Sequence, residues 1–223
     1  MQRKRPYHHG NLKKTLLDAA VKVIAKVGPG AFTLREVARQ AKVSHNAPYR
    51  HFRDKEELLA AVAAQGFERL ADSMVQAAAP ASDALNALIL TGHGYVQFAL
   101  RWPEHFSAMF DYCRGLDAYP DYAASGRRAF QVLLDHVVGA QRAGELRPED
   151  ANALALTAWS MVHGVAKLAV ANLLPFASEH SVLEFTAFAT RALAEGIGSK
   201  NKASSPTESP ARSAGKTPGS PHS

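Results

Sequence analysis

The segment VSHNAPYRHFRDKEELL, residues 43–59, contains two helix starts and an unusual density of hydrogen-bonding side chains. Ser44 is a natural N-cap for a short helix, because a serine hydroxyl can accept a hydrogen bond from a free backbone N–H of the first turn. Asp54 can cap the next helix in the same way, with Glu57 at the third helical position. The segment therefore predicts a short polar helix followed closely by a second helix.

Two further helices are predicted upstream of this segment. The spacing of apolar residues over 12–27 is that of one face of an amphipathic helix, which Gly28 would end. Thr33 and Glu36 fit a capping box at the start of a short helix. This helix and the one expected at Ser44 are separated by about three residues, which is the outline of a helix-turn-helix motif. An ordinary corner between two helices would show the same caps.

The rest of the chain to about residue 198 reads as helical, because no segment has the two-residue alternation of a strand. Helices are expected near residues 83–101, 104–113, 119–143, 149–173 and 181–197. The predicted fold is all-α, with a small N-terminal three-helix domain and a larger helical domain. The expected organisation is a basic arm (1–9), a helix-turn-helix domain (10–55), a larger helical domain (56–198) and a disordered Ser/Pro-rich tail (199–223).

Charge is distributed unevenly along the 223 residues. The net charge is +6, yet residues 1–55 carry 13 Lys and Arg against 3 Asp and Glu. The segment that follows, residues 56–198, is acidic overall. A positive N-terminal region on an acidic body favours a polyanionic partner such as nucleic acid, although charge blocks also serve to keep surfaces hydrated.

The composition indicates a cytoplasmic location. The single cysteine, Cys113, excludes an internal disulfide and fits a reducing compartment. No apolar stretch follows the basic N-terminus, so a secretory signal is not expected. The longest apolar run is interrupted by Asn86, His93 and Gln97, so we do not interpret it as a membrane span.

The polar residues around the predicted turn have the side chains that duplex DNA requires. A helix that enters the major groove contacts base edges with residues near its N-terminus, and Asn46 can form a bidentate pair with adenine. Donors that bind phosphates fix the register of the protein on the duplex. Each residue alone could simply belong to a solvated helix face, but the set beside a basic arm favours DNA. The candidate DNA-binding residues are Thr33, Ser44, His45, Asn46, Tyr49, Arg50, His51 and Lys55.

The ordered motifs AAVKVIAKVG, FTLREVARQAKVS and YRHFRDKEELL resemble the DNA-binding domain of the tetracycline-repressor (TetR/AcrR) family. The resemblance implies that Thr33, Tyr49 and Lys55 contact the DNA backbone. It also implies a homodimer whose larger domain binds a small molecule that lowers the affinity for operator DNA, with repression as the usual outcome. The C-terminal half resembles the Trp-His-Gly branch of that family, through Trp159, His163 and Gly164 in WSMVHGVAKLAV.

Two residues depart from the usual helix-turn-helix pattern. Lys42 occupies a turn position where glycine is common, and a left-handed conformation there would cost about 1 kcal/mol. Pro48 has no N–H to bond to the carbonyl of Ser44, so either the cap shifts or the first turn is irregular. We therefore expect an altered entry of the recognition segment into DNA.

The larger domain offers a candidate ligand pocket and a candidate dimer interface. Aromatic and sulfur side chains gather between residues 93 and 113, and an apolar cavity with a few polar groups suits a small molecule. At helical spacing such a stripe can equally be plain core. The small and apolar faces of the helices expected at 149–173 and 181–197 could pair across a two-fold axis or be buried within the subunit. The candidate pocket residues are Tyr95, Phe98, Trp102, Phe106, Met109, Phe110, Trp159 and His163.

The residues and the family resemblance together thus predict a DNA-binding transcriptional regulator that is released from double-stranded operator DNA by a small apolar ligand. A helical enzyme acting on a small apolar substrate is the main alternative, but no catalytic motif has a convincing context. A membrane-surface module is the third, and Asp18 within short capped helices argues against a long amphipathic anchor. No cofactor and no metal site are expected, because His105 and Cys113 have no further ligands nearby.

Overall fold

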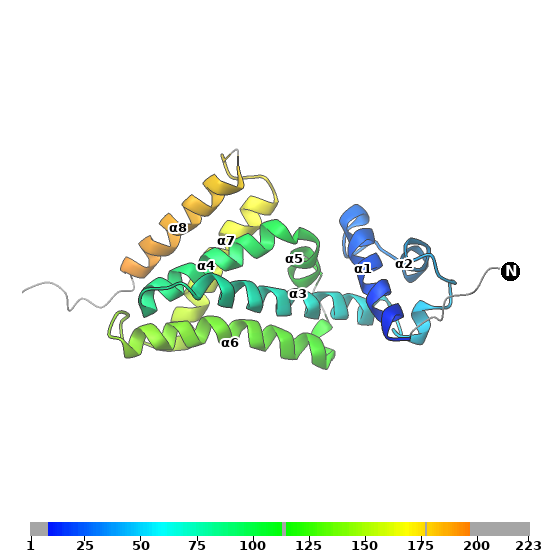
Figure 1. Ribbon diagram of the computed structural model, residues 1–223, viewed down its shortest axis with the longest axis horizontal. Helices are drawn as coiled ribbons and strands as arrows, with labels where there is room; N and C mark the ends of the chain where they lie inside the picture. The colour runs from blue at the N-terminus through cyan, green and yellow to red at the C-terminus, as the bar shows by residue number, and fades with distance from the viewer. Residues whose placement is uncertain (1–8, 113–114, 177, 197–223) are drawn as a thin grey trace, which may run out of the picture.

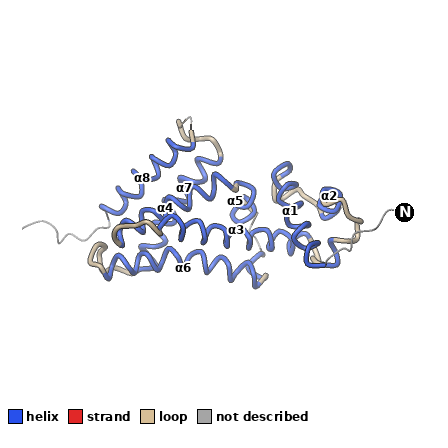
Figure 2. Tube along the Cα trace, viewed as in Figure 1, coloured by secondary structure: helices blue, strands red, loops and turns tan. Residues whose placement is uncertain are grey.

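The computed structural model describes residues 9–112, 115–176 and 178–196, and in these residues the chain is helical with no strand (Figure 2). The all-α prediction is confirmed. Most of the predicted arm (1–9) and all of the predicted tail (199–223) lie outside the described residues. The elements in chain order are α1 (His9–Val27), α2 (Leu34–Gln40), the 3₁₀ turn η1 (Pro48–Arg50), α3 (Lys55–Ala78), α4 (Ala84–Arg101), α5 (Pro103–Phe110), the 3₁₀ turn η2 (Leu116–Ala118), α6 (Pro120–Arg142), α7 (Ala151–Val170) and α8 (Glu179–Gly196).

A small N-terminal head, formed by α1, α2 and η1, lies at one end of a larger helical body (Figure 1). The predicted capping box of α2 is confirmed. The Thr33 hydroxyl accepts a bond from the backbone N–H of Glu36 at 3.2 Å, and the Glu36 carboxylate accepts one from the Thr33 N–H at 2.9 Å. Leu16, Ala20 and Val37 are fully buried between the helices of the head, because their spacing places them on the inner faces of α1 and α2.

The expectation that Ser44 is the N-cap of a short helix is wrong: the cap shifts, which is one of the two outcomes expected from Pro48. The backbone turns at residues 44–47 and forms only the short 3₁₀ turn η1, whose N-cap is Ala47. The Ser44 carbonyl accepts a bond from the N–H of Ala47 at 2.9 Å, because Pro48 has no N–H to offer it. Lys42 has a φ of 57°, so the turn position is left-handed, the conformation that costs a residue other than glycine about 1 kcal/mol.

Helix α3 connects the head to the body. Asp54 caps it as predicted, accepting a bond from the Glu57 N–H at 2.7 Å. From there α3 continues into the body, where α4 and α6 pack along it (Figure 1). The approach of α4 is close, because a Cβ on Gly94 would lie 2.6 Å from the carbonyl oxygen of Ser73 on α3.

The body places α7 and α8 against α4, while α6 packs on α3, α4 and α7. The five helices expected in this region are confirmed, with ends that differ by a few residues. By length and composition α7 could cross a membrane, with a mean hydropathy of 1.4, and 39% of that stretch is buried inside the body.

Candidate functional site

The polar side chains around η1 form an exposed face on the head. We call the set Ser44, His45, Asn46, Tyr49 and Arg50 the recognition face; all five residues are exposed. Tyr49 stands out, since 54% of its surface is accessible although it is a large aromatic residue.

Buried neighbours fix the orientation of the recognition face. Ala47 and Pro48 are buried, and Phe52 is only 2% exposed. The Lys13 ammonium on α1 lies 5.9 Å from the centroid of the Phe52 ring. Because the buried residues Ala47, Pro48 and Phe52 pack η1 against the rest of the head, the polar side chains of the recognition face point toward solvent.

The remaining predicted DNA contacts, Thr33, His51 and Lys55, lie beside the recognition face and are more constrained. The Thr33 hydroxyl is occupied by its capping bonds to Glu36, and His51 is half-buried. The Lys55 ammonium donates to the Gly30 carbonyl and lies over aromatic rings, as described next.

Lys55 takes part in the contact between head and body. Its Nζ lies 5.2 Å from the ring centroid of Phe32 in the head and 5.3 Å from that of Tyr112, which follows α5 in the body. A second contact lies nearby, where the Tyr119 hydroxyl donates to the Asp54 carboxylate at 3.2 Å. The sequence did not indicate this role for Lys55.

A cavity of ≈540 Å³ lies within the body. This is in the usual range for small-molecule sites. Helices α3 to α7 all contribute to it, mainly with apolar and aromatic side chains. The lining residues are Phe67, Leu70, Met74, Tyr95, Phe110, Tyr122, Ala123, Gly126, Arg127, Ala129, Phe130, Gln131, Leu133, Leu134, Asn152 and Trp159.

The predicted pocket residues divide into four groups. Tyr95, Phe110 and Trp159 line the cavity. Trp102 lines a separate polar groove, where the guanidinium groups of Arg69 and Arg101 lie 5.5 Å and 4.9 Å from its ring. His163 contacts residues of the cavity wall, and three members belong to the packed core instead: Phe98, Phe106 and Met109.

A hydrogen-bonded chain joins Trp159, Tyr95 and His163 at the wall of the cavity. Trp159 Nε1 donates to the Tyr95 hydroxyl at 3.1 Å, and that hydroxyl lies 2.9 Å from His163 Nδ1. Burial lowers the pKa of His163, and the nearby Lys167 adds to the effect. Burial also raises the pKa of the Tyr95 phenol, so we infer that Tyr95 donates to a neutral His163.

Sequence reasoning missed the contributions of α3 and α6 to the cavity. Gly126 and Ala129 are small residues three apart on α6, and Phe67 on α3 lies 3.7 Å from where a Cβ on Gly126 would be. The small residues at helical spacing on α6 could have indicated the cavity, because small side chains leave space beside a helix without interrupting it.

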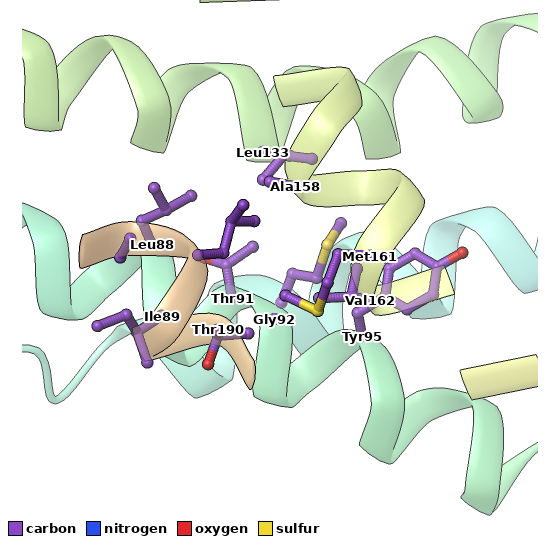
Figure 3. Close-up of a pocket in the computed structure, with 13 residues that line it drawn as sticks. Leu88, Ile89, Thr91, Gly92, Tyr95, Leu133, Ala158, Met161, Val162 and Thr190 are labelled. Atoms are coloured by element: carbon purple, nitrogen blue, oxygen red, sulfur yellow. The ribbon is translucent and has the colours of Figure 1, made fainter. Parts of the chain in front are cut away.

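A second, much smaller pocket of ≈30 Å³ lies between α4, α7 and α8 (Figure 3). Its lining is apolar and includes Ile89, Met161 and Val162. Tyr95 and Leu133 line both this pocket and the larger cavity, so the two spaces are adjacent and separated by shared side chains.

A helix-turn-helix head joined to a helical body with an internal cavity defines a class of DNA-binding transcriptional regulators. The family model for bacterial regulatory proteins of the tetR family matches the sequence over residues 16–62. The family model for the tetracyclin repressor-like C-terminal domain matches residues 88–193. The chain belongs to the TetR family of transcriptional regulators.

Known proteins resemble the chain over different lengths. The HTH-type transcriptional repressor Rv3405c of Mycobacterium tuberculosis is 36% identical over 61 residues, which is 27% of this chain and 32% of that protein. The HTH-type transcriptional regulator BetI of Rhizobium meliloti is 38% identical over 99 residues, or 43% of this chain and 47% of BetI. The chain thus spans about a third to a half of the length of these relatives.

A solved structure covers far more of the chain. A protein of unknown function from Rhodococcus sp. RHA1 is 35% identical, and the match covers 87% of this chain and 99% of that one with a TM-score of 0.76. The fold of head and body together is therefore shared with a relative of substantial sequence identity.

Proposed function

We propose that this chain is a homodimeric repressor that binds double-stranded operator DNA and is released by a small apolar ligand in the ≈540 Å³ cavity. The observation that carries the proposal is that one helix, α3, begins at Lys55 just after the recognition face and lines that cavity farther along its length. This arrangement favours a regulator over a helical enzyme acting on a small apolar substrate, and the expected location is the cytoplasm.

Base reading is assigned to Ser44, His45 and Asn46, which are exposed on the turn before η1. Phosphate binding is assigned to Thr33, Tyr49, Arg50, His51 and Lys55. The positive charge of residues 1–55 supports contact with phosphates, because phosphate contacts provide most of the sequence-independent affinity for DNA.

The dimer interface is assigned to α7 and α8. The strongly apolar α7 leaves much of its surface outside the core of its own subunit, including Leu156 and Leu168. On α8, Phe188 is 67% exposed. Two such helices from each subunit can form a four-helix interface around a two-fold axis, which would bury these side chains.

Release of DNA requires a coupling between the cavity and the head. Phe110 at the end of α5 lines the cavity, and Tyr112 just beyond it contacts Lys55. A ligand that favours another position of α5 would change the placement of Lys55 and the separation of the two heads. The ligand can shift this balance only by its difference in affinity for the two states.

The branch of the family marked by Trp-His-Gly is a further assignment for this chain. It is supported by Trp159 and His163, which both bond to Tyr95 at the cavity wall. In this arrangement the two residues would shape the ligand site rather than contact DNA.

Selection of bound duplexes from a random pool tests the proposed function. We expect a two-fold symmetric site with half-sites about 34–36 Å apart, one turn of DNA. Asn46→Ala should weaken binding to that site far more than to random DNA, since one good base contact is worth about 1–3 kcal/mol of discrimination. A purified protein that binds all duplexes equally would rule the proposal out.

A further inference from the structure

The cavity has an apolar interior and a polar mouth. Leu70, Met74 and Tyr95 are almost completely buried at its inner wall. Arg127, Gln131 and Asn152 are exposed and line the same cavity. An occupant would therefore meet hydrocarbon inside and hydrogen-bonding groups where the cavity opens to solvent.

The inner polar groups are already paired. The Tyr95 hydroxyl bonds both Trp159 and His163, so the pairing within the wall uses its proton and one of its lone pairs. A buried polar group on a ligand would find few partners here and would lose its hydration, which is costly. The inner end of the ligand should consequently be apolar.

Arg127 supplies the charge at the mouth. Among the described residues that line the cavity, it is the only one with a charged side chain. The neighbouring Arg128 is occupied, since it pairs with Glu68 and Asp72 on α3. Within the described part of the chain, Arg127 forms no such pair.

We infer that the cavity takes an anionic amphiphile, with its apolar chain against Leu70, Met74 and Tyr95 and its terminal anion on the Arg127 guanidinium. The guanidinium group fits carboxylate and phosphate oxygens in a bidentate geometry, so either anion satisfies the chemistry. This inference rests on the proposed function, because it names the class of ligand that the proposed effector site would bind.

The fluorescence of Trp159 provides a direct binding measurement. The chain has two tryptophans, and Trp102 lies outside the cavity, so Trp102→Phe leaves a single reporter in the cavity wall. In this background we would titrate dodecanoate, dodecyl phosphate and dodecanol below their aggregation limits. An anionic head should bind about tenfold more tightly than the neutral alcohol, as expected for a charge-assisted hydrogen bond at an exposed site.

Two arginine variants test whether Arg127 causes the preference for the anionic ligand. Arg127→Gln should bring the ratio of the dodecanoate and dodecanol affinities close to one, whereas Arg128→Gln should keep the preference for the anion. Comparison of dodecanoate with dodecyl phosphate shows which anion the site prefers. Equal binding of anion and alcohol by the Trp102→Phe protein, or a preference that survives Arg127→Gln, would overturn the inference.

The release of operator DNA is measured separately with the same ligands. If dodecanol binds as tightly as dodecanoate and both release DNA, the proposed function stands and the inference is wrong. If the anion binds through Arg127 without releasing DNA, the inference stands and the proposed release is wrong. If no alkyl ligand changes the fluorescence of Trp159, the inference is wrong, and the DNA selection alone decides the proposed function.

Discussion

Replacement of Phe188 by alanine tests the proposed dimer at a highly exposed aromatic residue of α8. Phe188 lies on α8 with 67% of its surface accessible, and its ring stacks at 6.5 Å on that of Phe185. Full burial of a phenylalanine side chain stabilises by about 1.5–3 kcal/mol. Two-thirds of that remains available in the isolated subunit, so each copy would contribute about 1–2 kcal/mol to dimerisation.

A two-fold interface contains both copies of the residue. Phe188→Ala should therefore weaken the dimer by about 2–4 kcal/mol, which raises its dissociation constant by about 30-fold to 1,000-fold. Sedimentation equilibrium over a range of concentrations measures this constant. Operator affinity should fall in parallel, because a monomer can engage only one half-site.

Val75→Ala is the matched control. Val75 is 52% exposed but lies on α3, outside the proposed interface, so its replacement should leave the dissociation constant unchanged. Circular dichroism of both variants checks that the helices remain intact. If Phe188→Ala and Val75→Ala dimerise equally well, α8 does not form the interface through Phe188, and the proposed four-helix arrangement is wrong.

Three other predictions concern packing, protonation and DNA. Gly94→Ala should lower the free energy of unfolding by about 1–3 kcal/mol through overpacking, since its Cβ would lie 2.6 Å from a backbone oxygen of α3. Gly139→Ala, with no atom within 4 Å of its Cβ, should raise the free energy of unfolding by about 0.5–1 kcal/mol, and urea titration distinguishes the two. Burial lowers the pKa of His105 to about 4, so the unfolded state binds the proton first, and stability should fall as the pH drops from about 6.5 toward 4. His105→Gln should reduce the difference between the free energies of unfolding measured by urea titration at pH 5 and pH 7. If the variant loses as much stability at pH 5 as the original protein, other groups cause the loss. Lys55→Ala should weaken operator and random DNA alike and reduce the salt dependence of binding by about one phosphate contact, and an unchanged slope would remove Lys55 from the DNA-binding residues.

Local signals were sufficient to predict most of the helices. Thr33 and Asp54 cap α2 and α3 as expected, because capping depends on residues only a few positions apart. The same local reasoning identified Pro48 as a conflict with a cap at Ser44. It could not decide how the backbone would resolve that conflict, since the answer depends on the packing of Phe52 and Ala47 beneath the turn.

The cavity was harder to predict, because it depends on which faces of distant helices meet. The aromatic stripe between residues 93 and 113 contains Tyr95 and Phe110, which line the cavity. The stripe also contains Phe98 and Phe106, which fill the core, and no local feature distinguishes a lining ring from a packed one. Arg127 was not predicted, because its importance arises only from its place at the mouth beside the already paired Arg128.

The continuity of α3 has a consequence for engineered hybrids. Its first turn is capped by Asp54 in the head, and Phe67, Leu70 and Met74 farther along the same helix line the cavity. One residue inserted into α3 between these points would turn the head by about 100° and shift it by about 1.5 Å relative to the body. Exchanging heads between relatives therefore requires that helical phase be conserved across the join, whereas a connection made through a flexible loop would tolerate a change in length.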